Sequence, residues 1–343
     1  MRFIVAIAVA AVLGLTAAAA RAETPVKIRT GWITTPTSLA PILFAKPELA
    51  PHLGKSYTLD PVHFAGTAPM ITALATGELD IAELAFASFG NAVQNGHMND
   101  LRIIADELQD GHPGYLSNGF LVLKDSPIKT IHDLKGKTIA TNVIGAGTDI
   151  ATRAYLRRIG LEAGRDYTVI EGNFFAMIPM LTEHKADLVT TIPATINDPR
   201  SLAVARVLFD LKDAMGGVTQ ILMRVARAGY VAKHRAALVD YFEDEIRELH
   251  WYLDPKNHEA AVTIVSNYTK IPKARLDPWL FTTKDTYRDP NDLPDLAALQ
   301  RNLKTQKEAG FLKIDIDVKK YADLSLVKEA GRRVNGEARR GMK

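Results

Sequence analysis

The sequence predicts an α/β protein of two lobes, each with a mostly parallel sheet flanked by helices. In Lys137–Gly160, an alternating apolar run ends in the small-residue turn Gly145–Thr148, and apolar residues then recur at helical spacing. A weak repeat suggests a second such unit, because "FAGTAPMITALATGELDIA" from Phe64 is similar to "EGNFFAMIPMLTEHKADLV" from Glu171. Each segment reads as a turn, a helix and an acidic residue before an apolar strand, which favours strand–helix–strand–helix–strand order in each lobe. Chance similarity of two ordinary β–α–β units is the alternative.

The amino-terminal residues read as a secretory leader. Met1-Arg2 precede an apolar run from Phe3 to Leu15, and Ala20-Arg21-Ala22 has the pattern of a cleavage site. This run is shorter than the ~20 residues that span a bilayer, which argues against the alternative of a membrane anchor. We therefore expect residues 1–22 to be a signal peptide cleaved after Ala22, and the mature chain to be soluble and exported.

Cysteine content and charge narrow the class of protein. The chain contains no cysteine, which excludes disulfides, thiol catalysis, thiolate-bound metals and a lipidated cysteine anchor. An exported protein without an anchor is expected in the periplasm of a two-membrane bacterium. Loss of Arg2 and Arg21 with the leader would lower the formal net charge from +3 to +1, and the remaining basic residues are scattered. Nucleic acid, which needs a concentrated basic face, is therefore excluded as a partner.

Motifs for catalysis and for nucleotides are missing from the sequence. The turn at Gly145–Ile150 has G-x-G without the third small residue of a dinucleotide site, and no phosphate-loop motif occurs. The nine histidines lack the spacing of a zinc site. We therefore expect no catalytic set, no cofactor and no metal, and the glycines of the turn are expected to let a small ligand approach the backbone.

Two sets of acidic residues are expected to have structural and not catalytic roles. Asp106, Glu107 and Asp110 form a cluster that reads as a solvated loop, because charge runs usually face water. Asp80 and Asp187 lie at equivalent strand starts of the repeat and read as turn formers.

Two facing lobes predict a cleft walled by helix N-termini at the carboxyl ends of the strands. Each N-terminus presents about half a positive charge and unpaired N–H groups, which together favour a small organic anion. An aliphatic, taurine-like sulfonate or carboxylate and an aromatic one are the alternatives. Threonine hydroxyls would add hydrogen bonds, and aromatic rings would pack on an apolar part of the ligand. An arginine clamp is not expected, and nitrate is disfavoured because it needs no apolar wall. The candidate ligand-binding residues are Trp32, Thr34, Thr35, Gly66, Thr67, Ala68, Ala85, Phe86, Asn118, Gly145, Ala146, Gly147, Thr148, Phe174 and Pro193.

Three segments carry a resemblance to a known family. "LVLKDSPIKTIHDLKGKTIATN" from Leu121 is similar to a segment of the periplasmic solute-binding proteins of ABC importers, in the sulfonate, nitrate and taurine group and its NMT1/THI5-like branch. "LATGELDIAEL" resembles the entry of that family into a strand, and "DVKKYADLSLVKEAG" resembles its closing helix. At Thr191-Ile192-Pro193 the chain departs from the Trp-Asp-Pro-like turn that is common in the family, and this departure bears on ligand identity.

The resemblance implies a type II periplasmic-binding-protein clamshell. Residues 23–118 plus 218–343 would form lobe 1, and residues 119–217 would form lobe 2. Hinge residues are expected at the two crossings, where glycine absorbs large changes of φ and ψ: Ser117, Asn118, Gly216 and Gly217. The implied role is that of a non-enzymatic, monomeric binding protein that delivers its ligand to an ABC transporter permease in the inner membrane. An enzyme on the same fold, like the thiamine-pyrimidine synthases, and a ligand-binding module of a membrane sensor are the alternatives.

Overall fold

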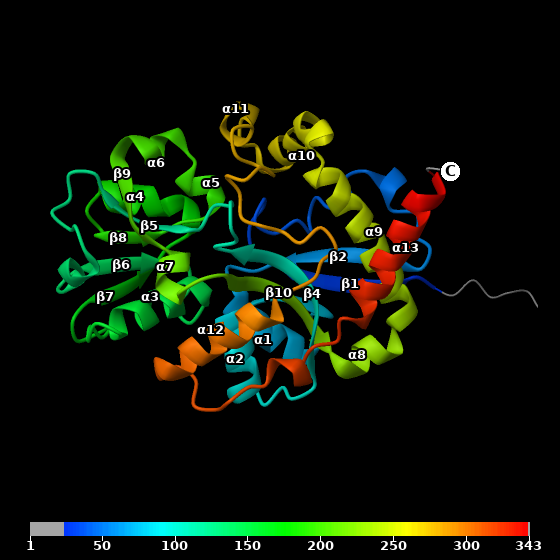
Figure 1. Ribbon diagram of the computed structural model, residues 1–343, viewed down its shortest axis with the longest axis horizontal. Coiled ribbons are helices and arrows are strands. Elements are labelled where there is room, and N and C mark those ends of the chain that lie inside the picture. The colour runs from blue at the N-terminus through cyan, green and yellow to red at the C-terminus, as the bar shows by residue number, and fades with distance from the viewer. Residues whose placement is uncertain (1–23, 342–343) are drawn as a thin grey trace, which may run out of the picture.

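The computed structural model describes residues 24–341 as two α/β lobes that lie side by side (Figure 1). The expected signal peptide and its cleavage site lie outside the described residues. Each lobe contains one five-stranded sheet, so the predicted two-lobe α/β fold is confirmed. Within the described residues, no helix has both the length and the apolar character needed to cross a membrane.

The sheet of lobe 1 has the strand order β2-β1-β3-β10-β4. Only β10 runs against the other strands, pairing antiparallel with β3 and β4. Helices α1, α2 and α12 pack on one face of the sheet, and α8, α9 and α13 pack on the other. The strands are β1 (Val26–Trp32), β2 (Tyr57–His63), β3 (Ile81–Ala85), β4 (Leu101–Asp110) and β10 (Thr219–Arg227). The helices are α1 (Thr67–Thr76), α2 (Phe86–Gln94), α8 (Ala228–Lys233), α9 (Arg235–Leu253), α12 (Leu296–Glu308) and α13 (Ser325–Gly341).

The sheet of lobe 2 repeats this arrangement with the order β7-β6-β8-β5-β9. Here β5 is the reversed strand, so in both sheets the reversed strand is the first one after the chain crosses from the other lobe. Its strands are β5 (Gly119–Leu123), β6 (Thr138–Thr141), β7 (Thr168–Glu171), β8 (Leu188–Thr190) and β9 (Ala205–Asp210). Its helices are α3 (Gly147–Arg157), α4 (Met177–Thr182), α5 (Pro193–Ile196), α6 (Pro199–Val204) and α7 (Leu211–Met215).

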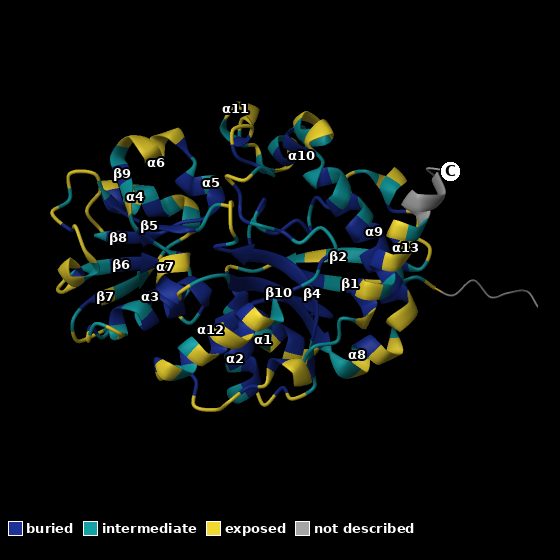
Figure 2. Ribbon diagram, viewed as in Figure 1, coloured by how far each residue is buried: buried dark blue, intermediate teal, exposed yellow. Residues whose placement is uncertain are grey.

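The remaining elements connect and cover these sheets. Helices α10 (His258–Thr269) and α11 (Lys273–Leu276) follow α9 and pack on it with the residues after β1. Short 3-10 helices lie at Pro47–Leu49, Ile131–Leu134, Phe174–Ala176, Pro255–Asn257 and Val318–Lys320. Figure 2 shows the central strands of both sheets largely buried, with exposed residues on the outer surfaces of the helices and in loops, and the edge strands β2 and β7 are partly exposed.

The two aspartates of the sequence repeat make the same contact in the two lobes. Asp80 Oδ2 accepts a hydrogen bond from Arg29 N at 2.9 Å, and Asp80 N donates to Arg29 O at 3.0 Å. Asp187 Oδ2 accepts from Thr138 N at 2.8 Å, and Asp187 N donates to Thr138 O at 2.7 Å. Each aspartate therefore fixes the strand that it precedes to the neighbouring parallel strand, a more specific role than turn formation.

The chain passes between the lobes at residues 111–118 and again at residues 216–218. Buried Asp110 accepts hydrogen bonds from Ser117 Oγ at 2.5 Å and from Asn118 N at 2.8 Å. Ser117 Oγ in turn accepts from Lys212 N at 3.0 Å, which links the two crossings. Gly216 and Gly217 have φ values of 72° and 140°, which side chains rarely tolerate. We therefore retain the proposed lobe boundaries after residues 118 and 217.

Carboxy-terminal segments packed on lobe 1 also touch lobe 2 away from the crossings. The Arg157 guanidinium on α3 lies 4.3 Å from the ring centroid of Phe311, and it donates a hydrogen bond to the carbonyl oxygen of Ala309. On another surface, Arg275 on α11 pairs with Asp198, the N-cap residue of α6. The lobes are thus joined by side-chain contacts as well as by the two crossings.

The prediction of a solvated acidic loop is wrong. Asp106, Glu107 and Asp110 lie in β4, and each is at most 5% exposed. The far edge of β4 is covered, because Asp106 N donates to Asp292 O and Gln109 N donates to Tyr287 O, both at 2.8 Å. Buried donors from β10 bond two of these acidic groups in place of water: Gln220 Nε2 lies 2.6 Å from Asp106 Oδ1, and Arg224 Nε lies 2.8 Å from Glu107 Oε2.

These buried carboxyl groups make stability depend on pH. Burial raises the pKa of Asp106 to about 8 and those of Asp110 and Asp292 to about 7, from an ordinary value of 3.8. Each group thus retains its proton in the folded chain at pH values where the unfolded chain has lost it. The contribution of these groups to the free energy of unfolding is therefore largest below about pH 4. It is lost as the pH rises towards 7 or 8, by up to ~1.4 kcal/mol per group and pH unit.

We therefore expect the melting temperature to fall between pH 5 and pH 8. The matched variant is Asp110→Asn, which can still accept from Asn118 N and can donate to Ser117 Oγ, but does not titrate. Thermal denaturation at half-unit pH steps should show a shallower fall for this variant than for the parent chain. Parallel slopes for the two chains would contradict a raised pKa at Asp110.

Candidate ligand-binding site

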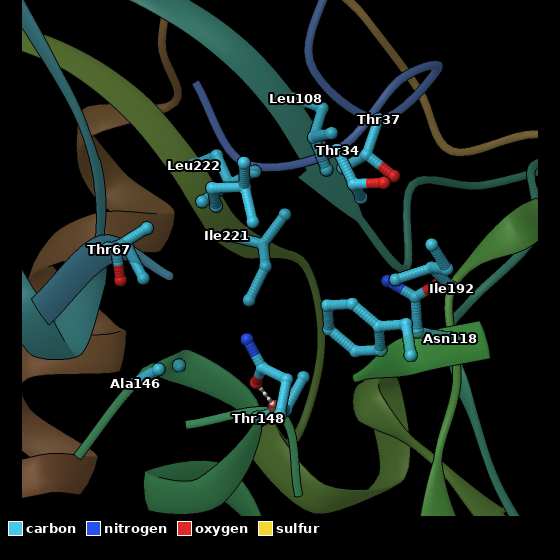
Figure 3. Close-up of a pocket in the computed structure, with 15 residues that line it drawn as sticks. Thr34, Thr37, Thr67, Leu108, Asn118, Ala146, Thr148, Ile192, Ile221 and Leu222 are labelled. Atoms are coloured by element: carbon cyan, nitrogen blue, oxygen red, sulfur yellow. Dashed lines mark hydrogen bonds between the residues drawn. The ribbon is translucent and has the colours of Figure 1, made fainter. Parts of the chain in front are cut away.

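A cavity between the lobes lies at the carboxyl ends of strands from both sheets (Figure 3). Its volume is about 50 Å³, several times the space that one water molecule requires. We call it the inner cavity. Its lining comprises Ile33, Thr34, Thr37, Thr67, Ala85, Leu108, Asn118, Asn142, Ala146, Gly147, Thr148, Phe174, Ile192, Ile221 and Leu222.

Three helices begin at the inner cavity, and each follows a strand directly or after a short turn. Helices α1, α2 and α3 have Gly66, Ala85 and Ala146 as N-cap residues, and none of these makes a side-chain capping hydrogen bond. The first-turn N–H groups of an α-helix have no partner within the helix, and the helix dipole makes this end positive. Residues of the first turns of α1 and α3 line the cavity. The arrangement provides positive potential and backbone donors from both lobes.

The side chains of the inner cavity are apolar or neutral. None of its fifteen lining residues carries an ionisable group, so a guanidinium clamp is missing from this wall. Thr67 Oγ1 lies 2.6 Å from Ser88 Oγ. Thr148 Oγ1 donates to Asn142 Oδ1 at 3.1 Å, the hydrogen bond drawn beside Thr148 in Figure 3. Because its oxygen accepts from Thr148, Asn142 keeps its amide nitrogen as a donor. Phe174, Ile192 and Ile221 supply apolar surface.

The structure brings together eight of the fifteen candidate residues. Those that line the inner cavity are Thr34, Thr67, Ala85, Asn118, Ala146, Gly147, Thr148 and Phe174. Trp32 and Thr35 line an adjoining pocket instead. The other candidates, Gly66, Ala68, Phe86, Gly145 and Pro193, line neither of these two spaces.

Gly145 and Gly147 have different roles in the turn. Gly145 has a φ of 85°, and its N–H donates to Asp149 Oδ2 at 2.8 Å, so this donor is already used within the protein. At Gly147, an added Cβ would lie 3.0 Å from Ile221 Cδ1 and 3.1 Å from Ala85 Cβ, both in lobe 1. Lobe 1 thus approaches the Gly147 backbone so closely that even a Cβ would be crowded. The two lobes therefore meet at this point of the cavity.

Seven lining residues are not among the candidates: Ile33, Thr37, Leu108, Asn142, Ile192, Ile221 and Leu222. Asn142 had a usable signal, because it is a polar residue directly after an apolar strand. Leu108, Ile221 and Leu222 had none, since apolar residues of β4 and β10 that face a cavity have the same pattern as residues that face the core.

One group of side chains in the described residues has the spacing of a metal site, namely His52, Asp240 and Glu243. Arg333 Nη1 lies 3.0 Å from Asp240 Oδ1 and 3.3 Å from Glu243 Oε2, and His52 Nδ1 is 2.7 Å from Asp244 Oδ1. Arg333 therefore already pairs with both carboxylates of the group, and His52 pairs with the neighbouring Asp244, so the group is best described as part of an ion-pair network.

Comparisons with known proteins agree with this architecture. Residues 112–242 match the family model described as NMT1/THI5 like, which confirms the resemblance predicted from the sequence for that part of the chain. No curated protein matches the chain. The fold is that of periplasmic binding proteins, as the following solved structures show.

The aliphatic sulphonate binding protein SsuA from Escherichia coli is 18% identical, with a TM-score of 0.63 over 87% of this chain and 92% of that one. The alkanesulfonate-binding protein SsuA from Xanthomonas axonopodis pv. citri, bound to MOPS, is 16% identical, with a TM-score of 0.68 over 88% and 100%. The nitrate-binding protein NrtA from Synechocystis PCC 6803 is 16% identical, with a TM-score of 0.67 over 90% and 89%.

Proposed function

We propose that this chain is the periplasmic substrate-binding protein of an ABC importer, and that it captures a small organic anion between its lobes. The observation that carries the proposal is the convergence of three helix N-termini, uncapped by side chains, on a cavity without ionisable lining residues. Such a site favours one negative group through backbone donors and helix dipoles. The fold shared with sulfonate- and nitrate-binding proteins supports an import role.

The apolar half of the lining selects among the anions. Nitrate has no apolar part that could contact Leu108, Phe174 and Ile221. The carbon skeleton of an organic sulfonate or carboxylate can pack on these side chains. The lining offers hydroxyl and amide groups but no carboxylate, imidazole or amine for acid–base chemistry, which supports a binding role rather than an enzymatic one. We propose the eight cavity-lining candidates as ligand contacts, and Ser117, Asn118, Gly216 and Gly217 as the hinge.

Native mass spectrometry of protein recovered by osmotic shock from its source tests both the ligand and the location. We expect a chain that begins at Glu23 and carries a small acid, which denaturing conditions release. A bound sugar, cation or nucleotide would contradict the proposed ligand class. A chain that retains Met1 would contradict export and would favour the alternative of an enzyme on this fold.

A further inference from the structure

We propose that the ligand carries an uncharged aromatic ring, and that this ring occupies a second pocket beside the inner cavity. We call this space the outer pocket. It is lined mainly by Trp32, Thr35, His63, Phe175 and Tyr268. The inference rests on the proposed function, because it assumes that the anionic group of the same ligand lies in the inner cavity.

The two spaces adjoin each other. Ile33 and Thr34, which follow β1, line both of them. In lobe 2, Phe174 lines the inner cavity while its neighbour Phe175 lines the outer pocket. The outer pocket has a volume of about 360 Å³, against about 50 Å³ for the inner cavity. The inner cavity therefore has space for a compact head group, and a larger substituent would have to extend past Ile33 and Thr34.

The walls of the outer pocket are aromatic on both sides of the cleft. The Trp32 ring centroid lies 4.6 Å from that of His63 and 6.4 Å from that of Tyr268, all in lobe 1. Phe175 faces them from lobe 2. Phe175 and Tyr268 are 48% and 45% exposed, among the largest exposures of bulky apolar side chains in the described residues. Exposed rings gathered at one pocket mark a binding surface, and aromatic faces and edges favour another ring.

The polarity of the outer pocket argues against a charged tail. Its lining contains no Asp, Glu, Lys or Arg, so a second charge on the ligand would find no carboxylate, ammonium or guanidinium as a partner, and the ring of His63 packs on Trp32. Thr35 is 95% buried, and its hydroxyl has no hydrogen-bond partner among the described residues. It is therefore a polar group of this wall whose hydrogen bonding the protein leaves incomplete. The chemical class that fits both spaces is an aryl-substituted sulfonate or carboxylate.

The test uses two pairs of probes that differ only by a phenyl ring: ethanesulfonate with 2-phenylethanesulfonate, and propionate with 3-phenylpropionate. Isothermal titration of the parent chain should show at least tenfold tighter binding of the phenyl member in at least one pair. The double variant Phe175→Ala, Tyr268→Ala removes two exposed rings and should fold normally. It should lose at least fivefold in affinity for the phenyl probe and change less than twofold for the short probe. Leu202→Ala, which truncates an exposed side chain on α6, is the control and should change neither affinity.

The outcomes separate the two proposals. Equal binding of short and phenyl probes by the parent chain would contradict the proposed aromatic subsite. The same holds if the double variant weakens binding of both members of a pair alike. Neither result would contradict the proposed anion-binding function. If none of the four probes binds, the proposed function itself is contradicted for sulfonates and carboxylates, and the aromatic subsite falls with it.

Discussion

Replacing Arg224 with methionine is expected to lower the free energy of unfolding by about 3–5 kcal/mol. Arg224 is 4% exposed in the middle of β10, with Nη2 2.7 Å from Glu107 Oε2, and it also pairs with Glu245. Both carboxylates are buried, and Glu83, whose pKa burial raises well above its ordinary value, lies in the same cluster. Without the guanidinium, these carboxylates must stay charged without a partner or take up protons at neutral pH. Urea denaturation of the ligand-free chain measures the loss.

The same strand offers a matched control. Arg227, at the end of β10, pairs with Asp100 at 2.7 Å, but the two side chains are 37% and 44% exposed. Water screens this pair, so Arg227→Met should cost no more than about 1 kcal/mol. Equal losses for the two variants would mean that the buried cluster does not depend on Arg224.

Replacing Gly147 with valine is expected to weaken ligand binding at least tenfold, or at least ~1.4 kcal/mol. A Cβ at this position already lies 3.0–3.1 Å from atoms of lobe 1, and the two γ-carbons of valine would reach further. The side chain would therefore hold the lobes apart and remove the first turn of α3 from a ligand bound against lobe 1. Small-angle scattering should show the parent chain contracting on addition of the ligand found by native mass spectrometry, whereas the variant should not contract.

Gly229→Val is the control for this substitution. Gly229 also lies in the first turn of a helix, α8, has no left-handed φ, and faces open space. It should leave both affinity and contraction unchanged. If Gly147→Val lowers the melting temperature but binds the ligand with the affinity of the parent chain, Gly147 serves only the turn and not closure.

The parts of the fold that the sequence predicts are those with local signals. The turn at residues 145–148 separates a strand from a helix as expected, and the repeat predicts two lobes of the same order. The acidic residues of β4 were misplaced because charge in a sequence usually indicates solvent. Their partners Gln220 and Arg224 lie more than a hundred residues further along the chain, and no local pattern connects them.

For the candidate site, too, the sequence predicts the residues that have a local signal and not the others. Residues in turns before helices could be found, because each turn combines small or hydroxyl residues with the start of an apolar period. The residues that β4 and β10 contribute could not be found, because Leu108 and Leu222 differ from core residues only in what lies opposite them across the cleft. The role of Gly147 as a contact for the opposing lobe likewise depends on how the lobes meet.

The position of β10 has a consequence for the order in which the chain can fold. All strands of the second sheet lie within residues 119–210, so this lobe has local connectivity and can form as soon as that stretch is available. The first sheet needs β10 between β3 and β4, and β10 comes after the whole of the second lobe. Until residue 227 is available, β3 and β4 each present an unpaired edge, and such edges are where chains associate wrongly. A chain that emerges from its amino-terminal end therefore completes its second lobe first, and its first lobe remains the aggregation-prone part until β10 has been inserted.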